Sequence, residues 1–205
     1  MPLLICDPGL EARIIADRAS KGGDHHDEVW CGVYFIPPLP DNEHQEFVGE
    51  LSGLLFHVVG NTGLGKVRPG VNLSPLAIDD WKYDFRVPDV VAFTNNTKAE
   101  THDTHWRGPA DFLVEIVGPH DRTYEKLPFC GRLGVRELLI VDRDPWKLEL
   151  YRHHDGELRL VGRSTVDDSQ PLPSEVVPLT FRLIAGVPRP QIEVMASDPP
   201  RQWQI

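Results

Sequence analysis

A short apolar segment near the middle of the chain, Phe112–Val117 with the sequence FLVEIV, constrains the fold most strongly. Its apolar residues occupy both alternating faces, which is typical of a strand that other elements cover on both sides. Glu115 is the one charged residue in this segment. Burying a carboxylate there costs on the order of several kcal/mol unless a cation or a hydrogen-bond donor pairs with it. The sequence therefore predicts a sheet covered on both faces and a partner for Glu115.

The segments around this strand predict a mixed sheet flanked by helices. Residues 124–133 have a helical pattern, with Pro128 tolerated in the first turn and Gly134 as the C-cap. Further strands are expected at 90–93, 137–142, 147–152 and 153–162. A hairpin turn should join 137–142 to 147–152, and 153–162 should be a final ribbon strand. Strands that alternate with a helix and then form a meander predict an α/β fold.

Residues 43–60 form the clearest helix of the sequence. Asn42 is the expected N-cap, with Gln45 completing a capping box. On a helical wheel His44 falls inside the apolar stripe, whereas Glu50 lies beside it or beyond its edge. The stripe consists of residues at three- and four-residue spacing: Phe47, Leu51, Leu54, Leu55 and Val58.

With 205 residues, the chain fits a single domain over 1–205. Residues 1–27 should be an N-terminal extension with a short helix, and 28–36 a strand or hairpin. Pro69 marks 66–73 as an edge strand, and 95–109 reads as a loop. The proline-rich residues after the meander should wrap the surface around one possible last strand, LTFRLIAG, with 185–205 as a C-terminal tail.

Charge and cysteine content narrow the class of protein. The net charge of −10 disfavours a general nucleic-acid coat, which needs a basic surface, but it permits an enzyme with a local basic patch and a bound cation. Cys6, Cys31 and Cys130 are few and far apart, which argues against a disulfide framework and fits a reducing cytoplasm. The sequence has no signal-peptide pattern and no long apolar run, so we expect a cytoplasmic protein without membrane contact.

Asp89 begins the strand upstream of Glu115, and Lys126 opens the helical segment downstream. If the two strands are neighbours, the carboxylates can converge on a hard cation such as Mg²⁺. A lysine beside them would stabilise negative charge that develops on a phosphate. Ordinary roles stay open for each residue taken alone. These are a turn for Asp89, an exposed edge-strand position for Glu115, a solvated helix position for Lys126, packing for His44 and a surface helix charge for Glu50.

The chain resembles the PD-(D/E)XK nuclease-like proteins, and within them the Uma2 family (DUF820) of restriction-endonuclease-like proteins. The resemblance covers roughly residues 28–151. It is carried by GVYFIPPLP, EHQEFVGEL and VPDVVAF, and most densely by FLVEIVGPHDRTYEKLPFCGRLGVRELLIVD with LELYR.

This resemblance implies a restriction endonuclease-like mixed sheet and a DNA endonuclease that depends on Mg²⁺ or Mn²⁺. Asp89 and Glu115 would bind the metal, and Lys126 would stabilise charge. Most of the superfamily carries that lysine two residues after the glutamate, where this chain has Val117. Glu28, His44 and Glu50 occupy positions near the family's pocket. The resemblance also implies a homodimer.

A second class of function stays open. The same fold could be a catalytically inactive module that binds nucleic acid or protein, which the net charge of −10 favours. The retained trio of Asp89, Glu115 and Lys126 favours an enzyme. The histidines at 25–26, 102, 105 and 153–154 lie in loops without the spacing of a zinc site, and Cys130 is expected to be a packed thiol.

Overall fold

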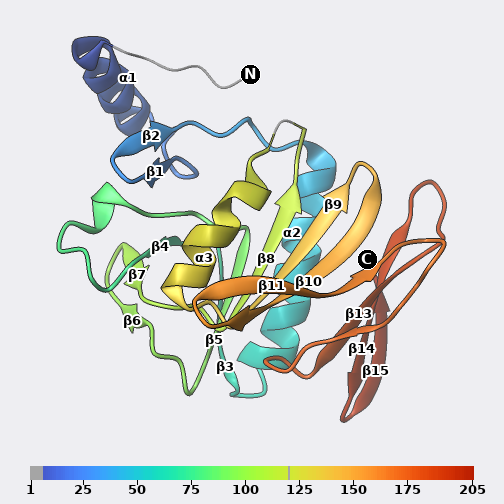
Figure 1. Ribbon diagram of the computed structural model, residues 1–205. Coiled ribbons are helices and arrows are strands. Elements are labelled where there is room, and N and C mark those ends of the chain that lie inside the picture. Colours follow the sequence, from blue (N-terminus) through green and yellow to red (C-terminus); the bar gives the residue numbers. More distant parts are fainter. Residues whose placement is uncertain (1–6, 120) are drawn as a thin grey trace.

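The computed structural model describes residues 7–119 and 121–205, and its centre is a six-stranded mixed sheet (Figure 1). The strand order is β11-β10-β9-β8-β5-β3. Only β8 and β9 are parallel; the other neighbours in this sheet are antiparallel. The predicted mixed α/β sheet is thereby confirmed. Its strands are β3 (Gly65–Pro69), β5 (Val90–Thr94), β8 (Phe112–Val117), β9 (Glu137–Arg143), β10 (Trp146–His154) and β11 (Glu157–Ser164).

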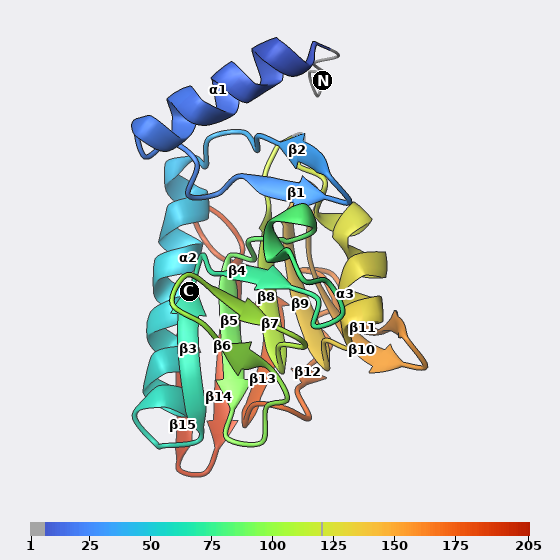
Figure 2. The same ribbon diagram turned by 90° about the vertical axis from the view of Figure 1, so that its left-hand side faces the viewer.

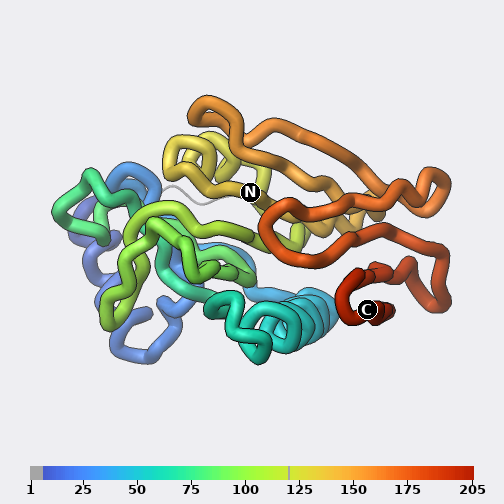
Figure 3. The backbone as a smooth tube through the Cα atoms, turned by 90° about the horizontal axis from the view of Figure 1, so that it is seen from below, coloured from blue at the N-terminus to red at the C-terminus, as the bar shows by residue number. Residues whose placement is uncertain are grey.

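Two helices cover opposite faces of this sheet, as seen from below in Figure 3. On one face, α2 (Asn42–Leu55), prolonged by a π-helical turn (Phe56–Gly60), buries its apolar stripe against β5 and β8. On the other face, a 3-10 turn (Thr123–Lys126) leads into α3 (Leu127–Leu133), which buries Phe129 and Cys130. Gly134 ends α3 in the left-handed conformation, as its position predicted.

The start of α2 differs by one residue from the prediction. Asp41, not Asn42, is the N-cap, because its carboxylate accepts a hydrogen bond of 2.7 Å from the backbone N–H of His44. Both residue types make good caps, so the sequence could not choose between them. Arg143 favours Asp41 as the N-cap, because its guanidinium pairs with the Asp41 carboxylate at 2.9 Å and holds it at the helix start.

The C-terminal part of the chain forms a second sheet, of which the sequence predicts one strand. The possible strand LTFRLIAG is present as β13, whereas residues 185–205, predicted to be a tail, contain two further strands. The alternation of buried residues such as Phe181, Leu183 and Val194 outweighs the turn signals of the many prolines, and the sheet packs into the same core as α2 (Figure 1). Its order is β12 (Leu172–Pro173), β13 (Leu179–Ile184), β14 (Gln191–Ser197) and β15 (Pro200–Gln204).

Smaller elements lie at the periphery (Figure 2). The N-terminal helix is α1 (Pro8–Ser20), and β1 (Glu28–Trp30) pairs with β2 (Val33–Phe35) in a hairpin. The predicted strand over 66–73 is divided at Gly70 into the edge strand β3 and β4 (Asn72–Ser74). The segment expected to be one long loop contains β6 (Glu100–Thr101) and β7 (His105–Arg107), which join β4 in a three-stranded sheet. A further 3-10 turn spans Trp81–Tyr83.

Two further predictions concern cysteines and membranes. Cys31 is an exposed and Cys130 a buried free thiol, and burial raises the pKa of Cys130 to about 12. Cys6 lies outside the described residues. Within 7–119 and 121–205, no helix combines the length and apolar character that crossing a membrane requires.

Two helical glycines offer a matched test of how α3 packs. A Cβ on Gly131 would lie 2.8 Å from Cα of Glu157 and from the carbonyl oxygen of Gly156, both of which are backbone atoms. A Cβ on Gly53 in α2 would meet nothing within 4 Å. We expect Gly131→Ala to lower the free energy of unfolding by about 1–3 kcal/mol through overpacking, and Gly53→Ala to raise it by about 0.5–1 kcal/mol. Urea denaturation measures the free energy of unfolding of both variants. Equal changes in the two variants would contradict the close packing of α3 on the backbone at Gly156 and Glu157.

Candidate functional site

Asp89 and Glu115 come together because β5 and β8 are adjacent antiparallel strands. Val90 pairs with Val114, so the ladder continued by one residue sets Asp89 beside Glu115. Oδ2 of Asp89 accepts a hydrogen bond of 2.7 Å from the backbone N–H of Ile116. Glu115 is 3% exposed, whereas the side chain of Asp89 keeps 20% of its surface open. The two predicted carboxylates therefore lie at one strand end, with Asp89 on the side that solvent reaches.

Lys126 is the partner that the buried Glu115 requires. It stands at the end of the 3-10 turn before α3, and its Nζ lies 3.2 Å from Oε1 and 3.0 Å from Oε2 of Glu115. The same ammonium lies 3.0 Å from Oε1 of Glu28. Lys126 is only 8% exposed, so the alternative of a solvated helix lysine is wrong.

Glu28 reaches the cluster from the β1–β2 hairpin. Its Oε1 accepts a hydrogen bond of 2.9 Å from the backbone N–H of Val87, two residues before Asp89, and its Oε2 accepts one of 2.7 Å from Nε1 of Trp30. Each oxygen of this carboxylate therefore has a partner, and the hairpin is fixed over the strand ends.

His44 belongs to the site, whereas Glu50 does not. Nε2 of His44, in the first turn of α2, lies 3.3 Å from Oδ1 of Asp89, and its buried Nδ1 has no hydrogen-bond partner among the described residues. Glu50 is exposed on another side of the same helix, and its charged neighbours are Glu46 and Arg189. The structure thus brings five of the six predicted residues together: Glu28, His44, Asp89, Glu115 and Lys126.

The cluster has excess negative charge. Three carboxylates against one ammonium leave a formal charge of −2 when His44 is neutral. Burial raises the pKa of the Glu115 carboxyl, Lys126 opposes the rise, and the charge of Asp89 adds to it. Burial alone would lower the pKa of Lys126, but the carboxylates of Glu115 and Glu28 raise it well above its usual value, so the side chain stays cationic. Asp89 likewise raises the pKa of His44 against the effect of burial.

Two residues near the cluster were not predicted. Trp30 holds Glu28 through its indole N–H, and the period of two along β1 could have indicated this contact. Asp121 lies close enough for its charge to raise the pKa values of Glu115, Lys126 and His44. It belongs to the turn between β8 and α3, where no periodic pattern marks single residues.

The residues present fit a divalent cation that the protein holds by few ligands. Within 7–119 and 121–205, no three His, Cys, Asp or Glu side chains are arranged to bind a metal by themselves. Mg²⁺ is nevertheless commonly bound by one or two carboxylates, keeping several waters. Asp89 and Glu115 would be the two donors, and the excess negative charge favours a cation beside them.

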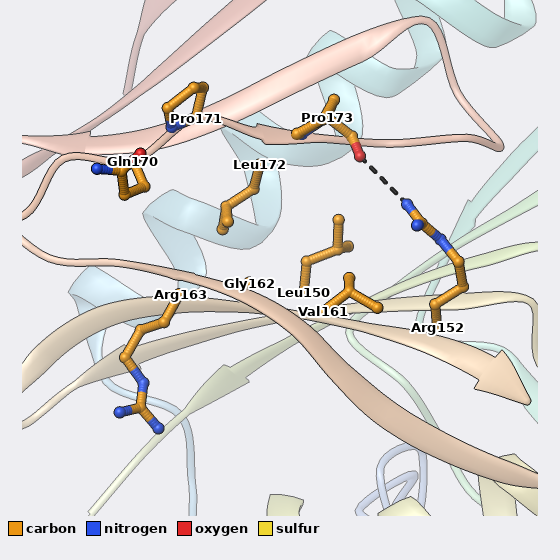
Figure 4. A pocket seen from close by; sticks show the side chains of 9 residues that line it. All are labelled: Leu150, Arg152, Val161, Gly162, Arg163, Gln170, Pro171, Leu172 and Pro173. Carbon is orange, nitrogen blue, oxygen red and sulfur yellow. Dashed lines mark hydrogen bonds between the residues drawn. The ribbon is translucent and has the colours of Figure 1, made fainter.

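The cavity drawn in Figure 4 lies apart from this cluster. It has a volume of about 370 Å³ and opens where β10 and β11 face the segment 170–173. Leu150, Val161 and Leu172 form its apolar part, and Arg152 at its rim lies 3.4 Å from the carbonyl oxygen of Pro173. None of the clustered ionic residues lines it.

Comparison with known proteins identifies the family of the chain. The model of the Uma2 family, described as "putative restriction endonuclease", matches residues 17–185. The chain belongs to the Uma2 family. Because the match covers the hairpin, α2, β5, β8 and α3, every residue of the cluster lies inside the part that defines the family.

The fold is also found in a solved structure, described as a "putative nuclease belonging to DUF820 from Anabaena variabilis ATCC 29413". The two chains are 18% identical, and the match covers 73% of this chain and 83% of the other with a TM-score of 0.56. At this identity the match shows the fold alone, which confirms the predicted nuclease-like α/β architecture. No curated protein matches the chain.

Removing the lysine tests the electrostatic account of the cluster. Lys126→Met leaves Glu28 and Glu115 buried without their cation, so we expect the free energy of unfolding to fall by about 3–5 kcal/mol. Lys21→Met is the control, because Lys21 forms an exposed pair with Asp17 at 2.8 Å and should cost less than about 0.5 kcal/mol. Urea denaturation at pH 7 compares the two. Similar values for both variants would show that Lys126 does not hold the cluster.

Proposed function

We propose that this Uma2 protein is a DNA endonuclease that hydrolyses phosphodiester bonds with Mg²⁺ or Mn²⁺. The observation that carries the proposal is the convergence of Asp89, Glu115 and Lys126 at one strand end, from three separate segments of the chain. A carboxylate pair that faces a lysine is the arrangement that suits metal-assisted attack on a phosphate.

Asp89 and Glu115 are the residues that would hold the cation. A bound Mg²⁺ supplies a Lewis acid for a phosphoryl oxygen and lowers the pKa of a bound water. The backbone N–H of Ile116 and the ring of His44 each contact one oxygen of Asp89, so this carboxylate is oriented before any ligand arrives. Such orientation reduces the reorganisation that binding requires.

Lys126 has two roles in this proposal. It neutralises part of the charge on Glu28 and Glu115, and its high pKa keeps the ammonium protonated near the place where charge would develop on the phosphate. Glu28 is a positioning residue, because it contacts Nζ of Lys126 as a second carboxylate beside Glu115. The long side chain of Lys126 thereby replaces the strand lysine that the chain lacks at Val117.

The competing proposal is a module that binds DNA or protein on the same fold without cleaving it. The net charge of −10 supports it. A module without chemistry has no need for a buried cluster whose formal charge is uncompensated, since such a cluster lowers stability. The homodimer and the cytoplasmic location stay predictions.

The proposal is tested by nicking of supercoiled and branched DNA in the presence of Mg²⁺ or Mn²⁺. The parent protein should cleave, and Asp89→Asn and Glu115→Gln should lose activity by at least about 100-fold, as expected when an electrostatic contributor is removed. Glu50→Gln is the matched control, because Glu50 is exposed and apart from the cluster. It should cleave at the parent rate.

Two results would contradict the proposal. One is a parent protein that leaves both DNA forms intact with either metal while calorimetry detects no metal binding that Asp89→Asn abolishes. The other is cleavage by Glu115→Gln at the parent rate, which would place the chemistry elsewhere. Circular dichroism of each variant verifies that it is folded.

A further inference from the structure

A second pocket, of about 390 Å³, lies beside the cluster but outside it. It opens between the edge strand β3 and the turn that joins β6 to β7, in the region shown at the front of Figure 2. Lys66 and Arg68 of β3 line one side, and His102, Asp103 and His105 line the other. No part of the proposed catalytic chemistry uses these side chains.

Lys66 and Arg68 are exposed cations without an acidic partner. Among the described residues, neither forms an ion pair within 4 Å, although the chain is strongly acidic and most of its arginines do. Nη1 of Arg68 donates only to the backbone carbonyl of Val67, and Nζ of Lys66 lies 5.9 Å from the ring centre of Trp106. Two adjacent cations on one strand face are therefore available to an anion.

Three aromatic rings form a column, of which His102 and His105 line the other side of this pocket. His102 stacks on His105 with ring centres 4.6 Å apart and planes at 4°, and His105 stacks on Trp81 at 4.3 Å and 10°. Burial, His102 and Arg107 lower the pKa of His105, so the central ring is neutral at pH 7. His102 ends the column and keeps 40% of its side chain exposed, next to the two cations.

The pocket and the cluster share one face of the central sheet. Arg68 pairs with Val91, which pairs with Leu113, and Glu115 lies two residues further along β8 on the same side. From the spacing of strands and residues, Cα of Arg68 is about 12 Å from Cα of Glu115. Gly70 lines the pocket, and its N–H donates a hydrogen bond of 3.2 Å to the backbone carbonyl of Asp89. A nucleic-acid strand bound at Asp89 would thus reach the pocket within a few nucleotides.

We propose that this pocket binds an unpaired nucleotide of the DNA strand that runs from the catalytic cluster. The base extends the column by stacking on His102, and Lys66 and Arg68 contact the adjoining phosphate. A stack of this kind needs a free base face, which single-stranded DNA offers and a duplex does not. Asp103 lines the pocket and Glu100 lies 3.8 Å from His102, so the phosphate is confined to the β3 side. The proposal rests on the proposed function in taking DNA as the ligand.

The test measures binding of the full chain to a fluorescein-labelled 15-nucleotide single strand and to its duplex by anisotropy, in EDTA so that no cleavage occurs. We expect the single strand to bind at least about tenfold more tightly than the duplex. His102→Ala should weaken single-strand binding by about tenfold, the effect of losing one base stack. Lys66→Ala/Arg68→Ala should reduce the slope of log K against log salt by about 0.7, the value for one neutralised phosphate of a single strand.

Matched controls and an abasic strand sharpen the result. His154→Ala and Arg159→Ala remove an exposed histidine and an exposed arginine near the β10–β11 turn, and both should bind like the parent. The parent should bind a strand with abasic sites as weakly as His102→Ala binds the normal strand. His102→Ala should bind the abasic strand and the normal strand with equal affinity. Equal binding of single strand and duplex, parent-like binding by His102→Ala, or binding of neither DNA would overturn the proposal.

These outcomes separate the pocket from the catalytic proposal. A protein that binds single strands through His102 but never cleaves DNA would refute the nuclease and support the pocket. A protein that cleaves DNA while His102→Ala and Lys66→Ala/Arg68→Ala bind like the parent would support the nuclease and refute the pocket.

Discussion

The contact on which the rest of the site depends is the buried ammonium of Lys126 between the carboxylates of Glu28 and Glu115. It joins three segments that are distant in the sequence: the β1–β2 hairpin, the central strand β8 and the turn before α3. Removing Lys126 would leave two buried carboxylates without compensation, so this ammonium holds the three segments in one arrangement. Strand pairing and the backbone N–H of Ile116 place Asp89 beside Glu115, with the Asp89 carboxylate partly open to solvent.

Two residues of the candidate site, Asp89 and Glu115, could be predicted because each stands out from its local pattern. A carboxylate inside an apolar strand needs a partner, which identified Glu115, and a proline-led strand start identified Asp89. The resemblance to a nuclease family supplied Lys126. Glu28 came only from that resemblance, since its role depends on a hairpin that folds back over Val87. Glu50 was misplaced because six residues after His44 the helix has turned by about 240° past a full turn, which carries it away from Asp89.

The features that could not be predicted from the sequence depend on contacts between distant segments. In the C-terminal sheet only β13 was predicted, where Leu179, Phe181 and Leu183 alternate as a half-buried strand requires, whereas prolines at the strand ends obscured the other strands. The choice of Asp41 over Asn42 as N-cap depends on Arg143, about a hundred residues away. His102 and His105 were considered only as zinc ligands and rejected, whereas their stacking on Trp81 needs the small sheet that pairs β4 with β7.

The central claim is that the excess negative charge beside Lys126 serves to bind a divalent cation at Asp89 and Glu115. Anomalous diffraction from crystals soaked in Mn²⁺ tests it most directly, because the ion is located without reference to any activity. The account predicts one ion at about 2.1–2.3 Å from a carboxylate oxygen of each residue, with water completing its coordination. An ion bound elsewhere, or a cluster in which Lys126 keeps both oxygens of Glu115 and no ion is present at saturating Mn²⁺, would contradict it.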